Sequence, residues 1–219
     1  MSVNENKGVI TRAEQKQLTR KTLIDTTVDV IAKDGFSGVT MAKVAERAGL
    51  SRGICNFHFQ TKEQLLLETL KALYQEFESA WQGAIAEAGS LPFEQIRSLI
   101  KTNLEPPVAD AKKIAVWLAY WGETPSRATY LKICQARDIA WEKAVEAILR
   151  QMSKTGFTSH GMSLAKIAQT LTAMMDGIWV EYLLSPDRLS PKEAVQACYA
   201  YLCSFFPGFD ENAKSNFRS

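Results

Sequence analysis

The strongest constraint on the fold is a pair of short helical patterns joined at a glycine, TMAKVAERAGLSRGICNFHF, residues 40 to 59. Apolar side chains recur at i, i+3, i+4 and i+7 of the first pattern, which places them on one helix face: Met41, Val44, Ala45 and Ala48. Thr40 precedes that helix as an N-cap, and Ser51 caps the second helix. Gly49 allows a turn of positive φ between them. The spacing predicts a helix-turn-helix, with the small Ala45 where the two helices cross.

The second helix of this pair carries polar and aromatic groups that point outward near its start and middle. They are Arg52, Asn56, Phe57 and His58. A helix of this kind fits the major groove of DNA, where Arg52 matches the edge of guanine and Asn56 the edge of adenine. The alternative for the pattern taken alone is a helical hairpin in an unrelated bundle, because short helix-turn-helix spacings also arise by chance.

Both flanks of the motif favour a DNA-binding domain of three helices. Upstream, an amphipathic helix ends at Asp34-Gly35, and its apolar face is formed by Ile24, Val28, Ile31 and Ala32. Downstream, Thr61 and Gln64 have the spacing of a capping box and open a long helix. We therefore expect the DNA-binding domain to occupy residues 12–62.

About a dozen positions agree in order and spacing with one known family: Gly35, Phe36, Thr40, Val44, Ala45, Ala48, Gly49, Ser51, Gly53, Phe59, Lys62, Leu65 and Leu66. On these residues the segment from about 15 to 70 resembles the TetR family of one-component transcriptional regulators. Asn56 is a departure, since many members have there a tyrosine that touches a phosphate, and Asn56 is expected to bond a phosphate or an adenine edge. Gly53-Ile54 followed by a residue other than tyrosine resembles the subgroup typified by the choline-responsive BetI repressor.

Charge is distributed unevenly, although the whole chain carries only +2. Residues 1–60 hold nine Lys or Arg against six Asp or Glu, a net of +3, and the remainder holds seventeen against eighteen, a net of −1. Between positions 7 and 21 the only acid is Glu14, against five basic residues: Lys7, Arg12, Lys16, Arg20 and Lys21. A flexible basic arm at residues 1–11 is expected to lie along phosphates and to make DNA binding salt-dependent. A solvated tail is the alternative for residues 1 to 10.

The residue pattern gives no support to catalysis or metal binding. The four cysteines form no C-x-x-C pair and the two histidines, His58 and His160, are far apart, so no metal site is expected. We find no phosphate-binding loop, no H-E-x-x-H and no nucleophile with a base, so we expect neither an enzyme nor a cofactor. The N-terminus lacks an apolar signal core, and Asp176 and Glu181 interrupt the apolar stretch 171–184. A cytoplasmic protein with no membrane span is predicted.

The rest of the chain also has the pattern of helices. Turn residues separate helical segments near 62–87, 92–105, 109–122, 127–154, 163–184 and 190–205. Alternation with a period of two residues is nowhere sustained, so the predicted class is all-α. We expect an N-terminal three-helix helix-turn-helix domain followed by a C-terminal helical domain at residues 63–219, to which the family resemblance assigns ligand binding and dimerisation.

Aromatic residues at helical spacing are the second informative feature. They lie in the segments AVWLAYWGE and MMDGIWVEYLLSP, which again resemble the ligand domain of the BetI subgroup. An aromatic cluster holds a quaternary ammonium by cation–π attraction, worth on the order of 2 kcal/mol per contact when desolvated, and a carboxylate adds to it. The candidate ligand-binding residues are Trp117, Tyr120, Trp121 and Trp179, with the carboxylates Glu123 and Asp176. The alternative is that the rings are plain core.

Asp176 interrupts an apolar run and must find a partner if it is buried. A ligand cation is one candidate partner. The other is a salt bridge across a dimer interface, to Arg127 or Arg137. Gly177 beside Asp176 indicates a close approach of helices, which favours the interface.

The family resemblance implies that the last two long helices of each subunit form a four-helix bundle in a dimer. The sequence is compatible, because these helices carry much apolar surface: Leu164, Ile167, Leu171, Met174, Met175, Ile178 and Leu183 on one, and Tyr199, Leu202, Phe205 and Phe206 on or near the other. Packing of these residues within one subunit is the alternative.

These observations predict a transcriptional repressor that binds a palindromic DNA operator as a homodimer. A small molecule is expected to release it, with choline or a related quaternary ammonium as the first candidate. A lipophilic or aromatic effector, or no response to choline, is the alternative. The expected DNA contacts lie on the helix-turn-helix or at nearby helix N-termini, where phosphates are favoured: Thr40, Lys43, Ser51, Arg52, Gly53, Asn56, Phe57, His58 and Lys62.

Overall fold

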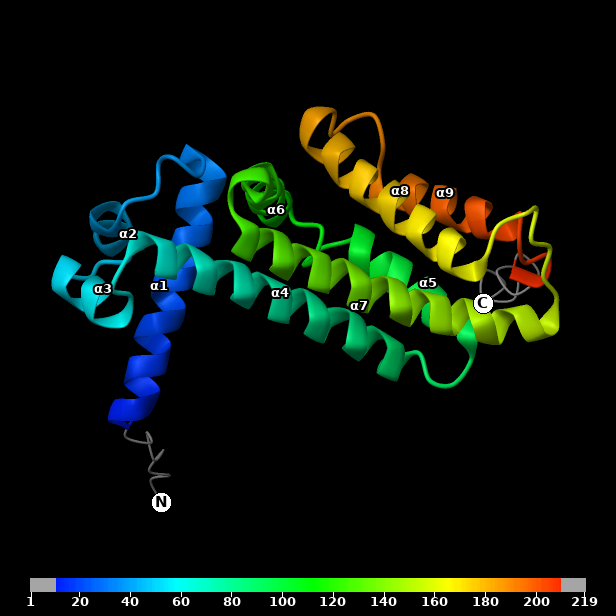
Figure 1. Cartoon of the computed structure of the whole chain (residues 1–219), viewed down its shortest axis with the longest axis horizontal. Coiled ribbons are helices and arrows are strands. Elements are labelled where there is room, and N and C mark those ends of the chain that lie inside the picture. The colour runs from blue at the N-terminus through cyan, green and yellow to red at the C-terminus, as the bar shows by residue number, and fades with distance from the viewer. Residues whose placement is uncertain (1–10, 210–219) are drawn as a thin grey trace, which may run out of the picture. The chain divides into compact units, whose positions relative to one another are not determined.

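The computed structural model describes residues 11–209, apart from the side chain of Ser126. The basic arm predicted at residues 1–11 therefore lies outside the described residues except for Thr11. Over the described range the chain forms nine α-helices and two short 3-10 helices and contains no strand, which confirms the all-α class (Figure 1). The helices form two compact units, one ending at Thr69 and the other beginning at Leu70.

The first unit consists of three helices and the beginning of a fourth. These are α1 (Arg12–Asp34), α2 (Met41–Arg47), α3 (Arg52–His58) and α4 (Lys62–Glu87), which continues into the second unit. The hydroxyls of Thr40 and Ser51 accept hydrogen bonds from backbone N–H groups in the first turns of α2 and α3, at 3.1 and 3.2 Å. Both helices therefore begin at the residues that the sequence predicts as caps.

The turn between α2 and α3 depends on the backbone conformation of Gly49, whose φ is 66°. The Leu50 N–H donates to the carbonyl of Ala45 at 2.9 Å, and the Gly49 N–H donates to that of Glu46 at 3.0 Å. This pair of bonds is a Schellman motif, which satisfies the last carbonyls of α2 while reversing the chain. This left-handed conformation costs about 1–2 kcal/mol for a residue with a Cβ, which explains why glycine occupies position 49.

The core of the first unit is formed by the inward faces of all four helices. Its fully buried members include Leu23, Val30, Val44, Ala45, Cys55, Phe59, Leu65 and Leu66. Arg20 of α1 forms an ion pair with Glu68 of α4, and its guanidinium lies 5.3 Å from the centre of the Phe59 ring. The two helices are thus joined at their surface as well as in the core.

The second unit contains the remainder of α4 and five further helices: α5 (Pro92–Leu104), α6 (Ala111–Glu123), α7 (Ala128–Met152), α8 (Leu164–Leu184) and α9 (Pro191–Cys203). The 3-10 turns Thr124–Ser126 and Ser153–Thr155 flank α7. Helix α5 packs against α7, α8 and α9, and α6 packs against α7 and α8. Figure 1 shows α8 and α9 lying side by side, in yellow to orange.

A buried arginine joins α5 to the last described residues of the chain. Arg97 donates a hydrogen bond to the carbonyl of Phe209 at 2.7 Å and another to Glu94 at 2.9 Å. Its guanidinium also lies 4.9 Å from the centre of the Phe209 ring and 6.0 Å from that of Tyr199. The carboxyl-terminal turn after α9 is therefore held by a charge in the core of the second unit.

The apolar residues of α8 are mostly used within the unit. Ile167, Leu171, Met175 and Ile178 are buried, while Leu164, Met174 and Leu183 are half-buried. Lys166 and Leu184 of α8 are exposed, and so is a row of residues spaced four apart, most of them small: Ala165, Gln169, Ala173 and Gly177. Between residues 11 and 209, no helix is both long and apolar enough to cross a membrane.

Candidate functional site

The outward face of α3 is exposed, as a helix that reads DNA requires. Ser51, Arg52, Gly53, Asn56 and Phe57 are all exposed, and His58 is half-buried. Phe57 keeps 70% of its surface in contact with solvent, which is unusual for a large apolar ring on a helix of seven residues. An apolar group held at this position can contact the methyl group of thymine in a major groove.

Basic side chains of α1 lie against the aromatic end of α3. The Lys16 ammonium is 5.2 Å from the centre of the Phe57 ring, and His58 meets the same ring edge-on with the ring centres 5.4 Å apart. Partial burial, together with the nearby cations Lys16 and Arg20, lowers the pKa of His58 below its ordinary value. His58 is therefore neutral at physiological pH, and the positive charge at this end of α3 comes from α1.

Two of the expected DNA contacts, Thr40 and Lys43, have structural roles within the first unit. Thr40 caps α2, and the Lys43 ammonium lies 3.2 Å from Asp34, which also pairs with Arg47 at 2.9 Å. The hydrogen bond from Lys43 is the main reason that the pKa of Asp34 is lowered. Lys62 is the first residue of α4 and is half-buried. Asp34 thus orients both basic side chains of α2, a pairing that the sequence analysis missed because it links two helices.

In the second unit, the aromatic residues gather around a cation that belongs to the chain itself. The guanidinium carbon of Arg137 on α7 lies 5.1 Å from the ring centre of Trp117, 5.3 Å from that of Trp121 and 6.0 Å from that of Trp179. A fourth ring, Phe77 of α4, is 5.3 Å away. Arg137 is only 3% exposed. We call these four rings with Arg137 the guanidinium cluster.

Two carboxylates flank the guanidinium cluster. Asp138 lies 2.7 Å from Arg137 and Asp176 of α8 lies 3.4 Å from it. Burial is the main reason that the pKa of Asp176 is raised to about 6; Arg137 opposes the rise and the charge of Asp138 adds to it. The predicted salt bridge between Asp176 and Arg137 is therefore present, but within one chain instead of across an interface.

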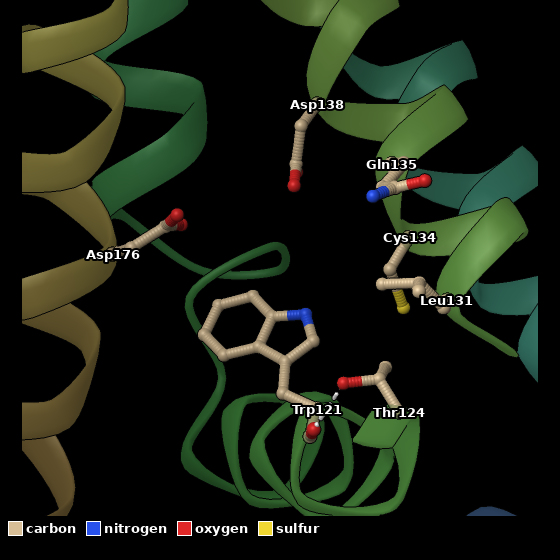
Figure 2. Close-up of a pocket in the computed structure, with 7 residues that line it drawn as sticks. All are labelled: Trp121, Thr124, Leu131, Cys134, Gln135, Asp138 and Asp176. Carbon is tan, nitrogen blue, oxygen red and sulfur yellow. Dashed lines mark hydrogen bonds between the residues drawn. The ribbon is translucent and has the colours of Figure 1, made fainter. Parts of the chain in front are cut away.

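A cavity of about 220 Å³ opens beside the cluster. It is lined by Trp121, Thr124, Leu131, Cys134, Gln135, Asp138 and Asp176. Figure 2 shows Asp138 from α7 and Asp176 from α8 pointing toward the same space near the Trp121 indole of α6. The cavity thus offers an aromatic ring and two carboxylates, a combination that suits a small organic cation.

Four of the predicted ligand residues lie outside the cavity lining: Trp117, Tyr120, Glu123 and Trp179. Tyr120 is fully buried and meets Tyr130 edge-on, with ring centres 5.4 Å apart. Glu123 is 3.0 Å from Arg127. Trp117 and Trp179 are buried in the guanidinium cluster, and the indole N–H of Trp179 donates to the backbone carbonyl of Asn103 at 2.9 Å.

Asp138 was not predicted for this site, and Arg137 was predicted only as a possible salt-bridge partner of Asp176 and not as the centre of the aromatic rings. A signal for Arg137 was present, because it falls on the apolar stripe of α7 between Cys134 and Trp141. A charged residue in such a stripe needs a buried partner. Among the described residues, no group of His, Cys, Asp or Glu is arranged to hold a metal ion.

Comparison with known proteins identifies the family. The model for bacterial regulatory proteins of the TetR family matches residues 23–69, and the model for the C-terminal part of BetI-type transcriptional repressors matches residues 92–207. The chain belongs to the TetR family of DNA-binding transcriptional regulators, with a C-terminal domain of the BetI type. This is a family of regulators and not of enzymes, as the sequence predicts.

Individual relatives agree with this assignment. The HTH-type transcriptional regulator BetI of Burkholderia mallei is 25% identical over 187 residues, which cover 85% of this chain and 93% of the relative. Among solved structures, a transcriptional regulator from Pseudomonas aeruginosa PAO1 has a TM-score of 0.76 at 25% identity and covers 98% of this chain and 100% of its own. One from Saccharomonospora viridis, in complex with choline, has a TM-score of 0.74 at 22% identity and covers 85% of this chain and 96% of its own.

Proposed function

We propose that this regulator is a dimeric repressor that a small organic cation of the choline type releases from its operator. The observation that carries the proposal is that one cavity is lined by an aromatic ring, Trp121, and by two carboxylates, Asp138 and Asp176. Asp138 and Asp176 together carry one negative charge more than Arg137 balances when both are ionised. A cation in the cavity neutralises that excess beside two carboxylates that are partly removed from water, with Asp138 40% and Asp176 30% exposed, so the charge pairing is stronger than in bulk water.

The size of the cavity supports a small effector. Its volume of about 220 Å³ is below the roughly 300–1,000 Å³ of sites that take drug-sized ligands. Choline combines a compact cation with one hydroxyl group. The amide of Gln135 is the polar group in the lining that we assign to that hydroxyl. The choline complex of the Saccharomonospora viridis regulator, which shares the fold at 22% identity, supports an effector of the choline type.

For DNA we propose that α3 enters the major groove and that Arg52 and Asn56 contact base edges. Phosphate contacts are assigned to the ends of α2 and α4. The proposed DNA-contacting set is Thr40, Lys43, Ser51, Arg52, Gly53, Asn56, Phe57, His58 and Lys62, and the domain that holds it is residues 12–62.

We further propose that the exposed face of α8 forms the dimer interface, with residues 63–219 as the ligand-binding and dimerisation domain. Ala173 and Gly177 leave room for another helix to approach closely, and a Cβ built on Gly177 meets no atom within 4 Å in its own chain. Since glycine inside a helix costs about 0.5–1 kcal/mol relative to alanine, a requirement outside the subunit accounts for its presence. A two-fold dimer also matches a palindromic operator.

The test combines a gel shift with a ligand titration. DNA from upstream of the protein's own gene is the first probe, and choline should release the protein from it in a saturable manner. All five tryptophans lie in the second unit, so their fluorescence reports on that unit alone. The matched control ligand is 3,3-dimethylbutan-1-ol, which has the shape of choline without the charge. Trp121→Ala should weaken the response to choline and leave DNA binding intact.

A neutral lipophilic effector is the second candidate, favoured by the apolar surface that Trp121 and Leu131 contribute to the lining. It predicts equal responses to choline and to its neutral analogue. A response to the neutral compound alone would refute the cation assignment and leave the DNA-binding regulator unchanged.

A further inference from the structure

The guanidinium cluster brings aromatic rings from three helices to one side chain on a fourth helix. Phe77 lies on α4, Trp117 and Trp121 on α6, and Trp179 on α8, while Arg137 itself comes from α7. Each ring centre is 5.1 to 6.0 Å from the guanidinium carbon. These distances are within the range in which a cation is attracted by an aromatic face. The aromatic groups of the site are therefore already occupied by a cation.

Two of the three nitrogen atoms of the Arg137 guanidinium lie close to carboxylates, and the third has no acceptor in the part of the chain that the structure describes. Its Nε and Nη2 atoms lie 2.7 Å from Asp138, and Nη2 also reaches Asp176 at 3.4 Å. Its Nη1 atom is buried and has no hydrogen-bond partner among the described residues. A buried donor without an acceptor makes the occupied state less stable than full pairing would. The cluster therefore holds Arg137 in a state from which it can be exchanged.

The cavity and the guanidinium cluster share their most important groups. Trp121, Asp138 and Asp176 line the cavity, and the same three residues contact Arg137. A ligand cation that uses this ring and these carboxylates would be placed next to the guanidinium, where two like charges repel each other. Both cations require the same partners, so they compete.

We propose that Arg137 is an internal surrogate for the effector, and that a small organic cation binds by displacing its guanidinium from the four rings and from the two aspartates. This inference rests on the proposed function, because it takes the effector to be a cation. It assigns to Arg137 the role of setting the affinity: the apparent Kd equals the intrinsic Kd divided by the fraction of molecules in which the guanidinium has left.

A ligand shifts a conformational equilibrium only if its contacts differ between the two conformations. Displacement of the guanidinium supplies such a difference between the ligand-free and the ligand-bound protein. When the guanidinium leaves, its contacts with α4, α6 and α8 are lost together. Helix α4 is continuous from Lys62 to Glu87 and so begins in the DNA-binding unit. The contact between Arg137 and Phe77 is the one through which this exchange reaches α4 directly.

The experiment measures binding of tetramethylammonium and choline by calorimetry and tryptophan fluorescence, in the wild-type protein and in Arg137→Gln and Arg137→Ala. If the guanidinium occupies the cluster in at least about nine molecules of ten, its removal should lower the Kd for the cation about tenfold or more. The variants should also melt at a lower temperature without ligand and show a larger rise in Tm with ligand. Arg150→Gln is the matched control, because Arg150 lies on the same helix, is exposed and pairs only with Glu146 among the described contacts.

A rescue experiment keeps the test valid if a variant folds poorly. In Arg137→Ala the vacated position should accept methylguanidinium at millimolar concentration, raise the Tm of the variant and compete with tetramethylammonium. Wild-type protein and Arg150→Gln should show neither effect at that concentration.

The outcomes separate this inference from the proposed function. Equal or weaker cation binding by both Arg137 variants, with the wild type responding to choline, overturns the displacement and leaves the proposed function standing. If the Arg137 variants bind the cations tightly and the wild type does not respond to choline, the role of Arg137 as an internal surrogate is supported and release of the wild-type protein by choline is refuted. Absence of cation binding in all forms overturns both.

Discussion

The replacement Asp176→Asn should make the empty regulator more stable and its response to cations weaker. The side chain of Asp176 is 30% exposed, and its partial burial raises the pKa of the carboxyl from an ordinary 3.8 to about 6. One pKa unit corresponds to about 1.4 kcal/mol, so the ionised carboxylate costs the folded state about 3 kcal/mol at pH 8. Asparagine removes that charge, keeps the shape of the side chain and retains an oxygen that can accept from Arg137.

The sign of the pH dependence follows from the direction of this shift. Because the folded pKa of Asp176 lies above its unfolded value, the folded state binds the proton more tightly, and stability increases as the pH falls through about 6. The asparagine variant lacks this component. The difference in unfolding free energy between variant and wild type should therefore fall from about 3 kcal/mol at pH 8 to about 1 kcal/mol near pH 4.5.

The assay is urea unfolding followed by tryptophan fluorescence at several pH values, since the signal comes from the second unit alone. Asp138→Asn is the control at the neighbouring carboxylate. Asp138 is the nearer partner of Arg137, at 2.7 Å, so its loss should cost about 1–3 kcal/mol. An Asp176→Asn protein that is no more stable than wild type at pH 8 would show that the ionised carboxylate is well compensated, and would refute the reasoning.

Three other substitutions test the roles of glycines. A Cβ on Gly53 meets only the Ser51 hydroxyl at 3.7 Å, so Gly53→Ala should raise the free energy of unfolding by about 0.5–1 kcal/mol in circular dichroism melts. The same variant should bind DNA more weakly in gel shifts. Unchanged DNA affinity would contradict a close approach of DNA at this position. Gly49→Ala should lower the free energy of unfolding of the first unit by about 1–2 kcal/mol, because the φ of Gly49 is 66°. An unchanged stability would argue against the left-handed turn between α2 and α3. Gly177→Leu should yield a folded monomer in analytical ultracentrifugation; a stable dimer would exclude the α8 face as the interface.

The helices could be predicted from the sequence because their limits are set by local chemistry. Thr40 and Ser51 cap the helices that follow them, Pro92 and Pro191 begin α5 and α9, and Gly49 forms the turn. Each of these effects acts within a few residues of its source, so no knowledge of the tertiary structure is required.

The site could be predicted only in part, because it depends on which faces of different helices meet. Trp117, Tyr120 and Trp121 share a helix face, yet only the two tryptophans contact the guanidinium, while Tyr120 packs on Tyr130. The position of Arg137 in the cluster results from the packing of α7 against α6 and α8. A helical pattern indicates that a charged residue will be buried, but it does not indicate what will surround it.

The bond between Arg97 and the Phe209 carbonyl sets a limit on how the protein can be shortened or fused. A chain that ends before Phe209 loses both the carbonyl and the aromatic ring that hold a 7% exposed guanidinium on α5. Such a truncation acts on the interior of the second unit even though it removes only the end of the chain. Affinity tags and reporter domains should therefore be attached beyond this residue, with Phe209 and the turn after α9 retained.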